Sequence, residues 1–273
     1  VYKRQVQEYK RQYHRALTAV DDSIGRINAW LKENDLADNT IVMLMGDNGF
    51  MFGEHGLIDK RNAYEESIRV PLLAYIPGLK EPGRVVEEIA AGIDIGPTVP
   101  EIAGVDKMPE QFEGQSLLPL ALGENPADWR EDLLYEYYWE FNYPMTPTTF
   151  ALRTENFKLI QYHGIWDTEE LYDIRNDPKE MNNLIDDPRY LEVRVRLRSE
   201  LHKRLANNNG EHAIPYTEKW GPGAHYRNSE GSKASQYPDE WLKNEDDEGL
   251  RDFMYRDENR LRDMKRQSQK KGK

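Results

Sequence analysis

A stripe of apolar residues at spacings of three and four marks the N-terminal part of the chain. It consists of Tyr9, Tyr13, Leu17, Val20, Ile24, Ile27 and Leu31. This spacing places the side chains on one face of an α-helix, because the helix turns roughly once every 3.6 residues. The pattern predicts one long amphipathic helix whose apolar face lies against a sheet.

Two short apolar runs follow and enclose a polar loop. The first is Asn39–Met45, and the second is Arg69–Ile76, which ends at Pro77-Gly78. Nearly continuous apolar runs of this length are typical of strands buried on both faces of a parallel sheet. We therefore expect an α/β sheet with the loop at the carboxyl end of the first strand, where ligands bind in such sheets.

The apolar pattern weakens beyond the second run. Residues 84–89 predict an edge strand, and Thr98–Gly104 predict a short helix that ends at glycine. Residues 106–130 contain Pro109, Pro119 and Pro126 and are typical of a connecting loop. We place a subdomain boundary in this segment.

Four short aromatic or β-branched runs come after the boundary, at residues 133–139, 149–153, 157–162 and 170–174. Consecutive strands on short links favour an antiparallel meander. Asp177-Pro178 and Asp187-Pro188 each predict a helix start, with Asp as the cap and Pro at the first helical position. The second start is followed by an apolar face that predicts a helix covering the sheet, at Leu191, Val193, Leu197, Leu201 and Leu205.

The composition changes at the end of that helix. Asn207–Gly210 is expected to break it, and the residues beyond mix glycine and proline with isolated tryptophan and tyrosine. We expect residues 207–273 to form a surface-wrapping or partly disordered tail. A last amphipathic helix is predicted within it, around Leu250, Phe253, Met254, Leu261 and Met264.

Charge and composition exclude several classes of protein. The chain has 49 acidic and 37 basic residues, a net charge of −12, which disfavours nucleic acid as a partner because phosphate binding needs a basic surface. No apolar run is long enough to form a transmembrane segment. Cysteine is absent, which excludes disulfides and thiolate metal ligands.

The polar loop carries the candidate chemistry. Asp47 and Asn48 supply oxygen atoms, the ligand type that Ca²⁺ prefers, although two residues cannot complete a shell of about six to eight oxygens. Lys60 carries a compact cation suited to a tetrahedral oxyanion. Each feature alone is ordinary: Asp-Asn-Gly is a common turn, and single residues such as Lys60 or His55 most often have structural or solvated roles.

The combination resembles the sulfatase family, within the alkaline-phosphatase-like superfamily. In that family a strand ends in Asp-Asn-Gly or Asp-His-Gly and is followed by Gly-Glu-His-Gly and a lysine, as in residues 46–60 here. The resemblance implies that Asp47 and Asn48 are calcium ligands and that Lys60 binds the sulfate oxygens. His55 is a candidate catalytic residue, at a position that varies among relatives.

The resemblance covers roughly residues 9–206. Residues 151–160 and 170–184 are similar to the C-terminal subdomain of N-sulfoglucosamine sulfohydrolases and bacterial polysaccharide sulfatases. The implied fold is α/β: an incomplete alkaline-phosphatase-like mixed sheet flanked by helices over residues 6–130, and a smaller antiparallel-sheet subdomain with a covering helix over residues 131–206.

Two loops of this subdomain carry side chains that sugars favour. They span residues 142–149 and 162–167 and join predicted strands. Loops on a rigid scaffold are common sites of specificity. His163 and Trp166 are therefore candidate sugar contacts, with packing as the ordinary alternative for both.

The nucleophile of the sulfatase family is absent. The family takes it from a Cys or Ser in Cys/Ser-x-Pro-x-Arg, oxidised to formylglycine, and this chain has no cysteine and no serine followed by x-Pro-x-Arg. The family's first two aspartate ligands are missing too. We expect a truncated chain that is inactive alone, with the nucleophile encoded upstream. Residues 1–5 match a translated transposon end used in sequencing libraries, so we expect an adapter scar and a natural sequence that begins near Val6.

The resemblance implies a calcium-dependent sulfatase acting on sulfate esters of a sulfated carbohydrate, periplasmic or secreted as the full-length protein. Two alternatives stay open. One is a phosphodiesterase or phosphonate monoester hydrolase of the same superfamily, which shares much of the metal and lysine arrangement. The other is a non-catalytic carbohydrate-binding protein on the same scaffold. The upstream coding sequence discriminates all three.

Overall fold

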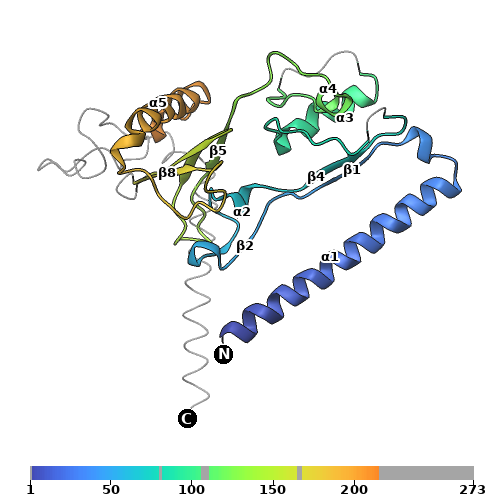
Figure 1. Cartoon of the computed structure of the whole chain (residues 1–273), viewed down its shortest axis with the longest axis horizontal. Helices are drawn as coiled ribbons and strands as arrows, with labels where there is room; N and C mark the ends of the chain where they lie inside the picture. The colour runs from blue at the N-terminus through green and yellow to red at the C-terminus, as the bar shows by residue number, and fades with distance from the viewer. Residues whose placement is uncertain (1, 80–81, 106–110, 165–167, 215–273) are drawn as a thin grey trace, which may run out of the picture. The chain divides into compact units, whose positions relative to one another are not determined.

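The computed structural model describes residues 2–79, 82–105, 111–164 and 168–214 as helices joined to small antiparallel sheets (Figure 1). The chain divides into two compact units, Val1–Arg204 and Leu205–Lys273. The candidate residues Asp47, Asn48, His55, Lys60 and His163 all lie in the first unit. Among the described residues, no helix combines the length and the apolar character of a transmembrane segment.

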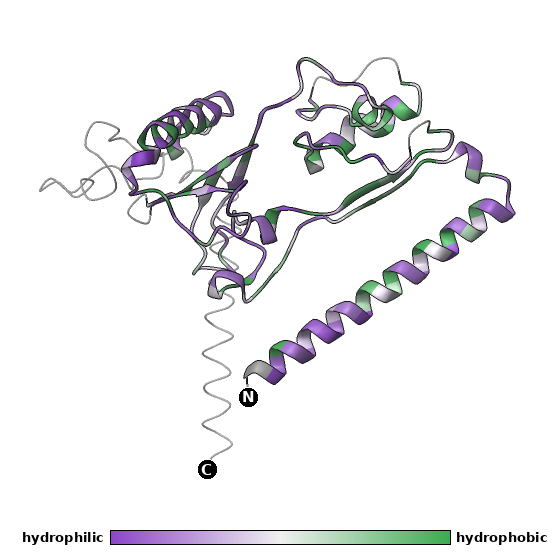
Figure 2. Ribbon diagram, in the orientation of Figure 1, coloured by the Kyte–Doolittle hydropathy of each residue, from purple (hydrophilic) through white to green (hydrophobic). Residues whose placement is uncertain are grey.

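The predicted N-terminal helix is confirmed as α1, Tyr2–Glu33. Figure 2 shows apolar positions recurring along it. The face that they form is not covered by a sheet, because Tyr9, Leu17 and Ile27 are 53%, 45% and 55% exposed. Aromatic contacts from the first half of the helix reach the polar loop, where the ring centroids of Tyr13 and Phe52 lie 4.9 Å apart. The expectation that a sheet covers this face is therefore wrong for the described residues.

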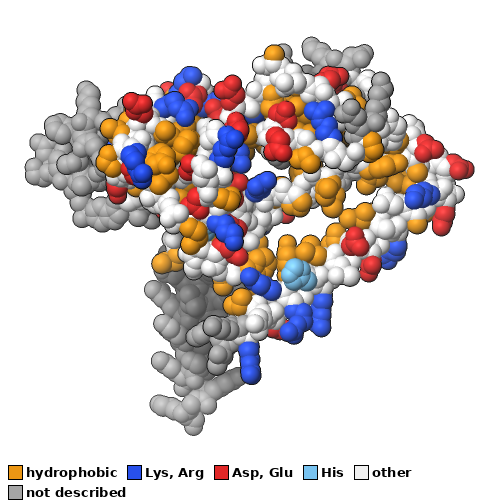
Figure 3. Space-filling view, viewed as in Figure 1, with side chains coloured by type: hydrophobic (Ala, Val, Ile, Leu, Met, Phe, Trp, Pro, Cys, Tyr) orange, Lys and Arg blue, Asp and Glu red, His pale blue; other side chains and the backbone are white. Residues whose placement is uncertain are grey.

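The two apolar runs beside the polar loop form β1, Val42–Met45, and β4, Leu72–Tyr75. They pair antiparallel, with Val42 opposite Tyr75 and Met45 opposite Leu72. Tyr75 is 58% exposed, and no third strand joins the pair within the part of the chain that the structure describes. The prediction of parallel strands buried on both faces is therefore wrong here, because an apolar run carries no information about strand direction. Figure 3 shows apolar side chains, in orange, exposed at the surface.

The polar loop between these strands folds into short elements. The strands β2, Met51–Phe52, and β3, Ile58–Asp59, form a hairpin. This hairpin encloses the 3-10 turn η2, Glu54–Gly56. Another 3-10 turn, η1, Ala37–Asn39, lies before β1. The short helix α2, Glu65–Ile68, then leads into β4. These elements place Asn48 and Lys60 near the same point of the loop.

The segment after β4 is helical. The turn η3, Gly92–Asp94, leads into α3, Ile95–Ile102, and α4, Leu118–Leu122, follows. The predicted short helix is thus confirmed, although it begins earlier than expected. The predicted strand at residues 84–89 is wrong, since these residues form no strand. Asp94 is fully buried there and holds the segment together, because its carboxylate accepts bonds from Arg130 and from the amides of Ala91 and Gln115.

The predicted antiparallel meander is confirmed. Its strands are β5, Asp132–Tyr137, β6, Thr149–Thr154, β7, Phe157–Tyr162, and β8, Glu169–Asp173, paired in sequence order. The middle of the sheet is packed on both faces. Leu152, Leu159 and Leu171 lie opposite one another on one face, and the neighbouring pair Ala151 and Ile160 lies on the other. All five side chains are completely buried.

The covering helix is α5, Leu191–Asn207, preceded by the turn η4, Pro188–Tyr190. Asp187 caps the turn η4, which leads into the helix, and accepts a hydrogen bond from the Arg189 amide at 2.9 Å. Leu197 and Leu201 are buried, and Arg198 donates to Glu169 of β8 at 2.6 Å, so the helix lies against the sheet. In the second unit, the chain leaves the helix after Asn207, as predicted, and forms η5, Glu211–Ala213. The predicted last helix around Leu250–Met264 lies outside the described residues.

The helix predicted to begin at Asp177-Pro178 is wrong. Residues 177–187 form turns, and Glu180 adopts a positive φ of 52°. A residue in this left-handed conformation cannot continue a right-handed helix. The Glu180 carboxylate is instead completely buried and lies 2.7 Å from Lys158, so a tertiary ion pair outweighs the local helix signal.

Candidate anion and metal site

The fold brings three predicted site residues together where β1 and β3 end. The Lys60 ammonium donates to the side-chain oxygen of Asn48 at 3.0 Å. The Asn48 amide group donates in turn to the Gly49 carbonyl at 2.8 Å, and the Asp47 carboxylate accepts from the Asn48 backbone at 2.9 Å. The structure therefore joins Asn48 to Lys60, with Asp47 beside Asn48 in the chain, and the predicted roles of the three residues stay predictions.

Lys60 is the cation left without a counter-ion at this place. It is exposed, and within the described residues it forms no ion pair with a carboxylate. Its neighbour Arg61 is fully engaged: it donates to both Asp59 oxygens at 2.8 and 2.7 Å and to Glu140 at 3.0 Å, and its guanidinium lies 3.3 Å from the Tyr143 ring centroid. An anion that approaches this loop therefore finds the unneutralised charge on Lys60.

The turn that carries Asn48 is packed tightly against α2. The Gly49 amide donates to the Ser67 carbonyl at 2.8 Å. A Cβ atom on residue 49 would lie 2.1 Å from the Glu66 carbonyl oxygen, far inside van der Waals contact. Glycine is therefore required at this position by close approach of two backbones.

The oxygen donors of Asp47 and Asn48 fit calcium chemistry. Asp47 and Asn48 offer a carboxylate and an amide oxygen, the hard ligands that Ca²⁺ prefers. Within the described residues no further His, Asp or Glu joins Asp47 in a group of three potential ligands. The two residues supply part of a calcium shell.

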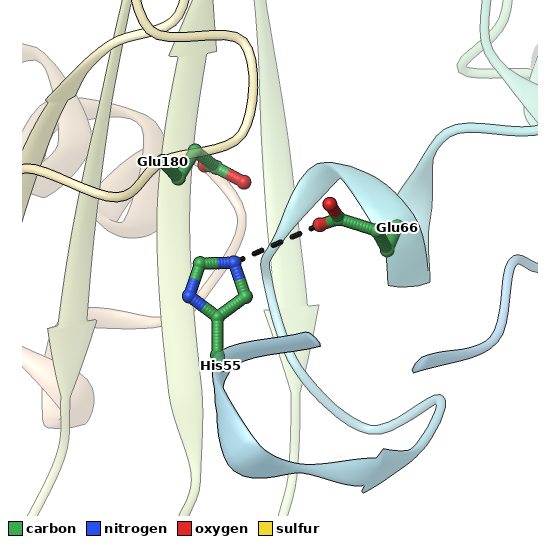
Figure 4. A group of neighbouring side chains, drawn as sticks. All are labelled: His55, Glu66 and Glu180. Carbon is green, nitrogen blue, oxygen red and sulfur yellow. Dashed lines mark ion pairs between the residues drawn. The ribbon is translucent and has the colours of Figure 1, made fainter. Parts of the chain in front are cut away.

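His55 lies in a different cluster. Its ring stacks on Tyr64, with centroids 3.9 Å apart, and its Nε2 lies 3.7 Å from the Glu66 carboxylate. Potential ligand atoms of His55, Glu66 and Glu180 all lie within 4.8 Å of one another (Figure 4). These are donor types found in zinc sites. The Glu180 carboxylate is already neutralised by Lys158 at 2.7 Å, which disfavours a second cation there. A catalytic role for His55 stays a prediction.

Lys158 is the centre of a buried ion network that sequence reasoning missed. Its side chain is completely buried, and its ammonium lies 2.7 Å from the Ala63 carbonyl, 2.8 Å from the Glu65 carboxylate and 2.7 Å from that of Glu180. Arg153 adds a longer pair to Glu65 at 3.5 Å. The available signal was a lysine inside the otherwise apolar start of a strand, Phe157-Lys158-Leu159-Ile160.

The two carboxyls of this network titrate differently. Burial raises the pKa of Glu65, but the charges of Lys158 and Arg153 outweigh burial and hold that pKa below its usual value. Burial raises the pKa of Glu180 above its usual value although Lys158 opposes the change. Glu65 is therefore the carboxylate that the network stabilises in its charged form.

A prediction on acid stability follows from Glu65. Because its folded pKa is lowered, its contribution to stability is present above its unfolded pKa of about 4.3 and is lost as pH falls through the folded value. The Glu65→Gln variant should therefore lose less stability than wild type between about pH 5 and pH 3. Urea unfolding followed by circular dichroism at a series of pH values measures this difference. The exposed Glu155→Gln variant is the control, and parallel curves for Glu65→Gln and wild type would contradict the prediction.

Three tyrosines connect the loop and the meander beside this network. The Tyr64 hydroxyl donates to Glu170 at 2.8 Å, the Tyr172 hydroxyl donates to the same carboxylate at 2.9 Å, and Tyr162 lies 3.4 Å from Tyr64 between hydroxyl oxygens. Burial raises the pKa of Tyr64 to about 12. The phenol thus stays a neutral donor at physiological pH.

The two loops proposed for sugar contact meet at their bases. The His163 amide donates to the Thr148 carbonyl at 2.9 Å, and its ring lies 6.2 Å from that of Phe150 between centroids. Trp166 lies outside the described residues. Sugar contact by His163 and Trp166 stays a prediction.

The sequence matches one protein family and many individual proteins. Residues 53–207 match the family described as N-sulphoglucosamine sulphohydrolase, C-terminal. An N-acetylglucosamine-6-O-sulfatase of Bacteroides thetaiotaomicron is 36% identical over 211 residues, which cover 74% of this chain and 37% of that relative. The chain thus spans well under half the length of this curated relative.

Solved structures show the same relation. A protein solved in complex with its substrate D-glucosamine-2-N,6-O-disulfate is 34% identical with a TM-score of 0.68, over 73% of this chain and 41% of its own. The phosphonate monoester hydrolase of Agrobacterium radiobacter is 28% identical with a TM-score of 0.61, over 69% and 39%. Both likenesses extend over more than two thirds of the present chain.

Proposed function

Since the chain belongs to the N-sulphoglucosamine sulphohydrolase C-terminal family of sulfatases, we propose that it carries the sulfate-binding part of an enzyme that hydrolyses sulfate esters of a carbohydrate. The strongest support for this proposal is the charge of Lys60, which is unpaired within the described structure. Its ammonium is exposed, has no carboxylate partner among the described residues, and is oriented by the neutral Asn48 side chain.

Lys60 is suited to the charge that develops during sulfate-ester hydrolysis. A sulfate monoester presents anionic oxygens, and negative charge shifts toward the leaving oxygen as the S–O bond breaks. A preorganised ammonium donor stabilises that charge without reorganising during the reaction. The bond to Asn48 holds the ammonium in place while leaving its full positive charge for the anion.

We assign Asp47 and Asn48 to a calcium ion, together with ligands that the present residues do not provide. When bound, such an ion polarises an oxyanion and orients it. The proposed nucleophile is a formylglycine, which the chain's own residues do not supply, because the chain has no cysteine and no Ser-x-Pro-x-Arg. The chain's contribution is therefore to bind and orient the sulfate group.

The substrate class rests on the relatives. One is an N-acetylglucosamine-6-O-sulfatase, and one solved relative holds a sulfated glucosamine as its substrate. A sulfated amino sugar is the class that we propose. Phosphonate monoester hydrolysis is the second candidate, because a solved enzyme of that type is similar over 69% of the chain and a lysine ammonium can also donate to the oxygens of a tetrahedral phosphonate.

Acetylation footprinting of Lys60 tests the proposal. The 273-residue chain is labelled with acetic anhydride, with and without sodium sulfate and CaCl₂, and each lysine is quantified by mass spectrometry. Sulfate should slow labelling of Lys60 and leave the exposed Lys203 unchanged. The Asn48→Asp variant is the matched comparison, because a carboxylate beside Lys60 neutralises the ammonium and should remove the protection.

The outcomes separate the candidates. Protection by sulfate supports the sulfatase proposal, and protection by methylphosphonate but not by sulfate favours the phosphonate hydrolase. Labelling of Lys60 that is unaffected by either anion at high concentration overturns anion binding at this residue. Equal protection in the Asn48→Asp variant would show that Asn48 does not tune the lysine.

A further inference from the structure

The segment that carries Lys60 is attached to the meander through buried charge. Lys158 of β7 bonds the Ala63 carbonyl and pairs with the Glu65 carboxylate, at 2.7 and 2.8 Å. Glu180 accepts from the Glu65 backbone amide at 2.7 Å. Two residues of the C-terminal subdomain, Lys158 and Glu180, thus hold residues 63–65 through bonds to main-chain and side-chain atoms.

The attachment continues to the candidate site through Ser67. The Ser67 carbonyl accepts from the Gly49 amide at 2.8 Å, next to Asn48. The Ser67 hydroxyl donates to the Lys60 carbonyl, and it also accepts from the Asn62 amide at 3.4 Å. Ser67 is 2% exposed and lies on α2, directly after Glu65 and Glu66. One short helix therefore bonds to the Lys60 main chain and to Gly49, the residue directly after Asn48.

Buried ions impose stricter geometry than apolar contacts. An apolar surface tolerates sliding, whereas a buried ammonium that loses an acceptor leaves uncompensated charge at a cost of several kcal/mol. The three acceptors of Lys158 come from Ala63, Glu65 and Glu180, so only one placement of α2 on the sheet satisfies all of them. The network is therefore suited to fixing position.

We propose that Lys158 and Glu180 are positioning residues for the anion site: they hold α2 on the meander, and α2 holds Asn48 and Lys60 in register through Ser67. The catalytic relevance rests on the proposed function, because the register matters to turnover only if Lys60 binds the substrate anion. The structural coupling itself is independent of that function. Neither residue contacts the site directly in the described structure.

The test combines two local readouts on the 273-residue chain. Amide hydrogen exchange reports on Gly49 and Glu65, whose amides form the two bonds described above. Acetylation reports on Lys60. The variants are Lys158→Met, which removes the ammonium, and Lys158→Met/Glu180→Leu, which removes both charges so that no carboxylate of the pair stays buried alone. The exposed Lys179→Met variant is the matched control.

We expect exchange at Gly49 and Glu65 to become about tenfold faster, the effect of losing roughly one net hydrogen bond, and Lys60 to be acetylated faster. The buried β6 and β7 amides of Leu152 and Ile160 should keep their protection. Lys179→Met should resemble wild type throughout. If the single variant does not fold, the double variant provides the test, because Glu180 is removed together with Lys158 and Glu65 keeps Arg153 as a partner.

Two results would overturn the inference. One is a folded double variant in which Gly49 exchange and Lys60 labelling equal those of wild type. The other is a uniform rise in exchange that includes Leu152 and Ile160, which means that the network supports stability without positioning the site. Protection of Lys60 by sulfate in the wild-type chain is measured in a separate experiment, because it tests the proposed function and not the coupling. Loss of sulfate binding with retained coupling contradicts the proposed function alone.

Discussion

Replacing Lys60 with alanine is expected to lower sulfate-ester turnover by about 10²–10³-fold, the usual effect of removing one preorganised donor to a developing oxyanion. The expectation applies to an enzyme that contains this chain together with its nucleophile. The physical reason is that no described carboxylate neutralises Lys60, whereas its neighbour Arg61 is paired with Asp59 and Glu140. Initial rates on a glucosamine 6-sulfate substrate measure the effect.

The Lys60 prediction has a matched control. Lys203 is 67% exposed on α5 and pairs only weakly with Glu200 at 3.5 Å, so Lys203→Ala should leave turnover unchanged. The Lys60→Arg variant keeps the charge but changes its shape, and it should retain an intermediate rate. A Lys60→Ala enzyme with the wild-type rate constant and Michaelis constant would exclude a role for this lysine in the reaction.

Replacing Gly49 with alanine should have the largest effect on folding of the loop. The new methyl group would lie 2.1 Å from the Glu66 carbonyl oxygen. The backbone cannot shift freely to relieve this clash, because the Gly49 amide is bonded to Ser67 at 2.8 Å. We expect a loss of about 3 kcal/mol in the free energy of unfolding, or detachment of α2 with loss of the Asn48–Lys60 bond.

Gly25→Ala is the control for this substitution. Gly25 lies inside α1, and a Cβ atom there meets nothing within 4 Å. Alanine should stabilise α1 by up to about 1 kcal/mol, because glycine is a poor helix former. Urea unfolding measures both variants, and exchange of the Gly49-region amides reports on the loop. A Gly49→Ala protein as stable as wild type, with the loop amides still protected, would show that the two backbones are not in close contact.

The parts of the fold that were predictable are those encoded by local pattern. The spacing from Tyr9 to Leu31 predicts α1, and Asp187-Pro188 with the apolar positions after it predicts α5, because helix periodicity and capping act within a few residues. The four-stranded meander was equally predictable, since short links force neighbouring strands to run antiparallel. The direction of β1 and β4 was not predictable, because an apolar run does not specify which way a strand pairs with its neighbour.

The candidate site, too, was only partly predictable from the sequence. Asp47, Asn48 and Lys60 were recognisable as a group from the glycine-rich loop and its family resemblance, and the structure brings Asn48 and Lys60 within hydrogen-bond distance. That Lys60 keeps a free charge while Arg61 does not was undecidable in sequence, because Glu140 lies 79 positions away from Arg61.

The sequence by itself determined the helices α1 and α5, the meander and the residues of the candidate anion site, since each depends on neighbours along the chain. Only the tertiary structure decided how that loop is held. The local signal at Asp177-Pro178 predicts a helix, yet Glu180 takes a left-handed turn to reach Lys158. A buried ammonium must be neutralised, and this long-range requirement is stronger than a helix cap.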